Sequence, residues 1–248
     1  MTQELRRLWS APFPWLLILG PTALNGALAL FQRRYGPERY WNFVGQFWDK
    51  LGLAAVAALV LTACLSLMDQ DRSCRTEALM FTARLGRKHL FLHRLLACAL
   101  VVFLFALLLS GGNLLCGLAL SRGLPVPEHW AARYLGHTLL AGAGGALLAL
   151  AACGLCEIFR SLPVAFILVA VVLLFSALAP ELKGEPLGLY VLANGFFAKL
   201  IRGRALTGWA SYSPPWGREW WFWGPWHLCL TALCVWRAIR KRKERNQW

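Results

Sequence analysis

Six long stretches of this chain carry no Asp, Glu, Lys or Arg, and they constrain its fold more than any other feature. They are Leu8–Gln32, Leu51–Met68, Leu95–Ser121, Tyr134–Cys156, Ser161–Pro180 and Trp220–Trp236. A helix needs about 20 apolar residues, with a range of roughly 17–25, to cross a bilayer. In hydrocarbon each backbone N–H and C=O must also be paired within its segment. The pattern therefore predicts an all-α integral membrane protein, with six transmembrane helices in one domain over residues 1–248.

The charge balance is consistent with a membrane surface. Only 15% of the residues are charged, yet the net charge is +14. A basic chain can bind nucleic acid, but anionic lipid at the cytoplasmic face attracts the same excess of Lys and Arg. No basic soluble domain is left outside the six stretches. Membrane lipids are therefore expected partners, and nucleic acid is not.

The distribution of Lys and Arg predicts the orientation. With six helices both termini lie on the same side. If that side is the cytoplasm, the inner segments hold 15 Lys and Arg, and the outer loops 33–50, 122–133 and 181–219 hold 11. The positive-inside rule therefore favours cytoplasmic N- and C-termini. The basic C-terminal segment 237–248 is the clearest indication, because its six Lys and Arg directly follow an uncharged stretch.

Candidate catalytic residues are scarce. The polar residues within or near the uncharged stretches are Asn25, Asn113, His137, Glu157 and His227. None is paired at the spacing of a known hydrolase, nucleotide-binding or metal motif. Cys153-x-x-Cys156 has metal or redox spacing, but its position within an apolar helix indicates packing. No catalytic residue, metal site or cofactor is therefore expected, and the chain is not predicted to be an enzyme.

Three local patterns predict further elements. MTQELRRLW at the N-terminus suits a short interfacial helix. Pro186–Ala198 is uncharged but too short to span, which favours a re-entrant or interfacial element turning at Asn194 and Gly195. Small residues recur at Ala141, Gly145 and Ala149, a stripe that allows close helix packing or a dimer contact.

The segment Asp69–Arg94 is a charge island between two uncharged stretches. Thr76 is a candidate N-cap, and Glu77 would lie in the first helical turn, where an acid is favoured. Gly86 then interrupts the helical pattern before the next stretch begins. The segment predicts a short amphipathic cytoplasmic helix, a glycine joint and the root of the third transmembrane helix.

The sequence RTEALMFTARLGRKHLFLHRLLA resembles the corresponding loop of ATP-binding-cassette type-2 exporter permeases. Glu77 matches the family's acid, Leu79-Met80 its apolar pair, Arg87 its middle base and Arg94 its final base. The chain lacks the family's Gly-Thr after the acid and its Pro before the middle base. In length and in its tryptophan-containing first outer loop, the chain is most similar to permeases of bacteriocin or lantibiotic immunity.

The resemblance implies a permease domain with a coupling helix that docks on a separate cytoplasmic ATPase in a bacterial cell membrane. The expected coupling residues are Arg75, Glu77, Leu79, Met80, Phe81, Arg84, Arg87 and Arg94. A second permease subunit, identical or related, would complete the exporter. An amphipathic peptide or hydrophobic compound is the expected cargo.

Two alternatives to an exporter remain open from the sequence. One is a membrane enzyme acting on lipid, with a polar site around Glu128, His129 and His137. The other is a membrane anchor subunit that does not transport and uses only its basic tail and small-residue stripe. For the enzyme, alanine at these three positions should abolish function while assembly stays normal. For the anchor subunit, the coupling loop should tolerate charge reversal without loss of transport.

Overall fold

A computed structural model describes residues 6, 10, 12–49, 51–64, 86–178, 197, 201 and 219–245. Helices make up almost all of these ranges, which contain no β-strand. The helices are α2 (Pro12–Gln32), α3 (Pro37–Gly45), α4 (Leu51–Cys64), α7 (Gly86–Ser121), α8 (Trp130–Phe159), α9 (Leu162–Leu178) and α13 (Glu219–Arg245). Two 3₁₀ turns, η1 (Arg33–Tyr35) and η2 (Gln46–Asp49), flank α3. The predicted all-α class is therefore confirmed.

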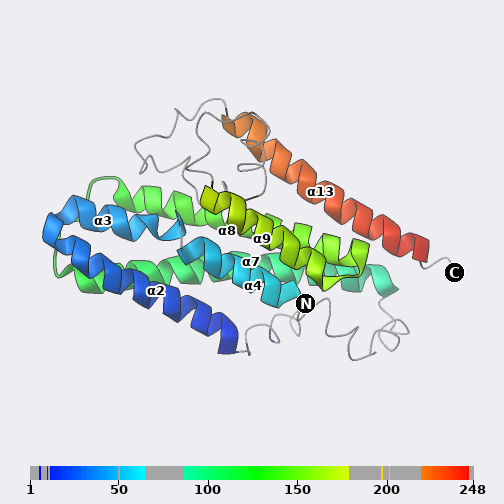
Figure 1. The fold of residues 1–248 in the computed structure, drawn as a ribbon, viewed down its shortest axis with the longest axis horizontal. Helices are drawn as coiled ribbons and strands as arrows, with labels where there is room; N and C mark the ends of the chain where they lie inside the picture. The colour runs from blue at the N-terminus through cyan, green and yellow to red at the C-terminus, as the bar shows by residue number, and fades with distance from the viewer. Residues whose placement is uncertain are drawn as a thin grey trace.

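The helices form an elongated bundle whose long axis follows α7 and α8 (Figure 1). These two helices are antiparallel neighbours, and α8 also packs against α4, α9 and α13. α2 lies along the half of α7 nearer Ser121. The contact is close, since an added Cβ on Gly26 would meet the Cys116 sulfur. We call the end of the bundle where α7 begins and α8 and α13 end the basic end. The opposite end, at the 122–129 connection, is the loop end.

Four helical segments of the described chain are long and apolar enough to cross a membrane. They are Pro12–Tyr35, Pro37–Ala63, Phe91–Ser121 and Trp130–Phe159, with a shorter apolar helix at Leu162–Val171. These segments support a membrane protein. The six-helix count stays a prediction, as does a crossing by α13, which continues from the sixth uncharged stretch into the basic C-terminal segment.

The predicted first outer loop, 33–50, differs most from the structure. Its larger part forms α3, which packs against α7, and η2, which leads from α3 into α4 (Figure 1). Tyr40, Trp41 and Trp48 are fully buried. The charged side chains of Glu38 and Arg39 lie on the exposed face of α3 instead. The loop expectation was wrong because these charges interrupt the sequence pattern while occupying only one side of the helix.

The small-residue stripe on α8 faces into this chain's own bundle. Ala141 and Ala149 are fully buried. At Gly145 an added Cβ would lie 2.9 Å from Val56 Cγ1 on α4 and 3.0 Å from Val102 Cγ1 on α7. Small side chains here allow α8 to approach two helices at once, so the stripe contributes to packing within the chain.

Replacing Gly145 with alanine is expected to lower the free energy of unfolding by about 1–3 kcal/mol, because the added methyl group overpacks the contact with two helices. Unfolding of the detergent-solubilised protein in SDS measures this change. Gly136→Ala on the same helix is the matched control, since an added Cβ at Gly136 would meet nothing within 4 Å. Equal effects of the two substitutions would contradict a close contact at Gly145.

Candidate functional site

Four residues from three helices form a cluster at the basic end, which we call the root cluster: Phe91 and Arg94 of α7, Glu157 of α8 and Arg242 of α13. Arg242 Nη1 lies 3.9 Å from Glu157 Oε2, with side-chain exposures of 13% and 7%. The Arg242 guanidinium also lies over the Phe91 ring, 5.1 Å from its centroid. Arg94 follows Phe91 by one helical turn and is buried. Charges and an aromatic ring therefore connect the beginning of α7 to α8 and α13.

Arg94, one of the expected coupling residues, belongs to the root cluster because it lies near the start of α7. α7 begins at Gly86, the predicted joint, and continues without a break to Ser121. Arg87 and Arg94 are thus part of the same rigid helix that crosses the bundle. Arg75, Glu77, Leu79, Met80, Phe81 and Arg84 lie outside the described residues.

A second buried polar cluster lies toward the loop end and is centred on Asn113. Its Oδ1 accepts a hydrogen bond from Asn25 Nδ2 at 2.7 Å. Its Nδ2 donates to the Val44 carbonyl at 3.1 Å and to the Tyr134 hydroxyl at 2.9 Å. Tyr134 donates in turn to the Ser110 carbonyl at 2.9 Å. One amide therefore joins α2, α3, α7 and α8.

Aromatic contacts hold α3 in the same region. The Trp130 indole donates to the Trp41 carbonyl at 2.9 Å. The rings of Trp130 and Tyr134 stack with centroids 4.9 Å apart, and Trp41 packs against Trp130 at the same separation. The Tyr40 hydroxyl donates to the Gly117 carbonyl of α7. These contacts fix a helix whose outer face is charged.

The residues considered for an enzyme site are not brought together. Glu128 and His129 form an exposed pair with 3.5 Å between Oε1 and Nε2. His137 is buried in α8, with its ring centroid 6.2 Å from that of Trp48. Eight helical residues separate it from His129, a rise of about 12 Å. Glu128 and His129 thus lie at the surface, and His137 lies inside the bundle.

The cysteines of the Cys-x-x-Cys pattern are also buried. Cys153 Sγ lies 3.5 Å from Cys98 Sγ of α7, and Cys156 is buried on the same helix. The part of the chain that the structure describes holds no group of three His, Cys, Asp or Glu placed to bind a metal ion. Both cysteines pack between helices.

The re-entrant element predicted over residues 186–198 is described at a single residue. Phe197 is fully buried, and its ring centroid lies 5.2 Å from that of His227 on α13. The predicted turn at Asn194 and Gly195 lies outside the described residues, as does the N-terminal interfacial segment apart from Arg6. Neither prediction is tested.

Comparison of the chain with protein-family models and with curated proteins finds no match. The functional interpretation therefore depends on the two polar clusters. The Asn113 cluster satisfies buried groups between helices. The root cluster differs because it places net positive charge at the base of the charged segment 69–94, so it is the better candidate for a functional contact.

Proposed function

We propose that this chain is the permease subunit of an ATP-driven exporter. Its basic end faces the cytoplasm, and the segment Glu77–Arg94 contacts a separate cytoplasmic ATPase. A second permease subunit completes the transport path in a bacterial cell membrane. The sequence resemblance suggests this function, and the root cluster is the observation that supports it best.

The root cluster gives a physical route from the charged segment to the bundle. A force applied before Gly86 acts on the start of α7, a helix of 36 residues. Arg242 of α13 lies beside Glu157 of α8 and over the ring of Phe91, which is near the start of α7. Rigid elements linked by buried polar contacts can transmit a displacement between distant sites. Movement at the coupling segment would therefore shift α7, α8 and α13 together.

The described surface also agrees with a hydrophobic or amphipathic cargo. Large apolar side chains are exposed along α2, including Leu16, Leu19 and Phe31. Hydrocarbon or another apolar surface is the environment that such a face requires. An antimicrobial peptide or another hydrophobic compound is thus the cargo that we propose.

Charge reversal in the coupling segment tests the proposal. Arg84→Glu combined with Arg87→Glu is expected to reduce permease-stimulated ATP hydrolysis at least about tenfold, because like charges at an interface disfavour docking. The assay uses the full chain reconstituted in lipid with the ATPase encoded by an adjacent reading frame. Co-purification of the two proteins is measured in parallel.

Arg122→Glu combined with Arg133→Glu is the matched control, since both residues are exposed at the loop end and give the same change of charge. This variant should keep its ATPase stimulation. If the coupling variant stimulates as well as the control, or if no ATPase co-purifies with the unmodified chain, the proposed function is wrong.

A further inference from the structure

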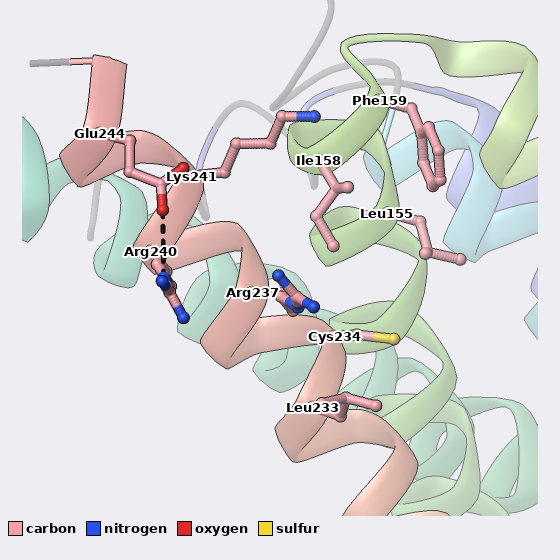
Figure 2. A pocket seen from close by; sticks show the side chains of 9 residues that line it. All are labelled: Leu155, Ile158, Phe159, Leu233, Cys234, Arg237, Arg240, Lys241 and Glu244. Atoms are coloured by element: carbon pink, nitrogen blue, oxygen red, sulfur yellow. Dashed lines mark hydrogen bonds and ion pairs between the residues drawn. The ribbon is translucent and has the colours of Figure 1, made fainter.

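A cavity of about 400 Å³ lies between the last turn of α8 and the C-terminal half of α13. The two helices approach closely at Gly154, where an added Cβ would lie 3.2 Å from the Cys234 backbone. The cavity lies beyond this contact, toward the basic end. Figure 2 shows Leu155 and Phe159 on its α8 side and the side chains of α13 opposite them.

The cavity has a basic part and an apolar part. Arg237, Arg240 and Lys241 line it from α13. Figure 2 shows the Arg237 and Lys241 side chains extending toward the end of α8, whereas Arg240 turns toward Glu244. Glu244 is the one acid in the lining, and its Oε1 lies 3.0 Å from Arg240 Nε. A positive surface therefore faces α8 beside an apolar wall.

The surroundings of the cavity indicate the depth at which it lies. Phe159, Leu233 and Trp236 are all more than half exposed, which suits a membrane environment. The Trp236 ring lies 5.6 Å from Arg237 Cζ and 5.7 Å from Arg240 Cζ. Tryptophan is enriched at the headgroup level, where one side of the ring meets cations and the other meets acyl chains. If α13 crosses the membrane as predicted, these residues place the cavity at the boundary between hydrocarbon and headgroups.

We propose that this cavity binds one anionic phospholipid. Its phosphate is held by Arg237 and Lys241, and its acyl chain lies against Leu155, Phe159 and Leu233. Basic pockets between transmembrane helices bind anionic headgroups, and the volume is within the range of small-ligand sites. A soluble anion would not need the apolar wall, and an acidic protein partner would not favour the exposed hydrocarbon-facing side chains. This site does not depend on the exporter proposal.

Native mass spectrometry of the full chain, titrated with dioleoylphosphatidylglycerol or dioleoylphosphatidylcholine, tests the site. The unmodified chain should bind phosphatidylglycerol at least about tenfold more tightly. Arg237→Ala with Lys241→Ala should weaken phosphatidylglycerol binding about thirtyfold, since each cation near the surface contributes to the attraction. Glu244→Gln should tighten it by about fivefold, because it removes the opposing charge at an exposed position.

Arg122→Ala with Arg133→Ala removes the same charge at the loop end and should change binding less than about twofold. Circular dichroism checks that each variant is folded, and Glu244→Gln keeps the proposal testable if the double variant does not fold. Equal binding of the two lipids, or equal losses in the double variant and the control, would overturn the proposal. Displacement of the lipid by equimolar inorganic phosphate would identify a soluble-anion site instead and would also overturn it.

Discussion

Replacing Asn113 with leucine is expected to lower the free energy of unfolding by about 2–4 kcal/mol. The substitution keeps the number and branching of the side-chain heavy atoms but removes all three hydrogen bonds of the amide. It leaves the Asn25 amide and the Val44 carbonyl buried without this partner. Each buried polar group that loses its partner costs about 1–3 kcal/mol. The free energy of unfolding in SDS measures the loss.

Two further variants make the Asn113 result specific. Asn25→Leu removes one of the three hydrogen bonds and should therefore cost a smaller amount. Leu115 lies two residues away on the same helix and is 69% exposed. Leu115→Ala should therefore change the free energy of unfolding by less than about 0.5 kcal/mol. If Asn113→Leu is no more destabilising than Leu115→Ala, the cluster does not hold the four helices together.

Replacing Glu157 with alanine is expected to cost about 3–5 kcal/mol, because it leaves the largely buried Arg242 guanidinium without its carboxylate. Arg94 is also buried at this end, so removing the acid increases the net positive charge where the three helices meet. The free energy of unfolding in SDS again measures the effect. Under the proposed exporter function, the same variant should also reduce ATPase stimulation, because the start of α7 loses a connection to α8.

The exposed pair Arg240–Glu244 on α13 is the control for this prediction. Its side chains are more than half exposed, and exposed ion pairs contribute about 0–1 kcal/mol. Glu244→Ala should therefore be nearly neutral. Adding Arg242→Met to Glu157→Ala should restore part of the lost stability, because an apolar side chain replaces the unpaired charge. A loss in Glu157→Ala no larger than in Glu244→Ala would contradict a buried pair.

The sequence pattern located most helices because uncharged stretches must be helical wherever they contact hydrocarbon. The predicted glycine joint stays a prediction, because the described part of α7 begins at Gly86 and the residues before it lie outside the described ranges. The pattern failed at α3, where Arg33, Arg34, Glu38 and Arg39 suggested an exposed loop. The burial of Tyr40, Trp41 and Val44 on one face of α3 shows the missed signal. That spacing is typical of an amphipathic helix. A search for uncharged stretches misses such a helix because charged residues lie on its other face.

The sequence alone determined the class of this protein, most of its helices and its excess of positive charge at the C-terminus. Only the tertiary structure brought together Asn25 and Asn113, which are 88 residues apart, and placed Glu157 beside Arg242. Periodicity specifies which residues share a face within one helix. The register between helices depends on close contacts such as Gly145 with Val56 and Gly154 with Cys234. Those contacts arise from packing across the whole bundle, so the polar clusters could not be read from any single segment.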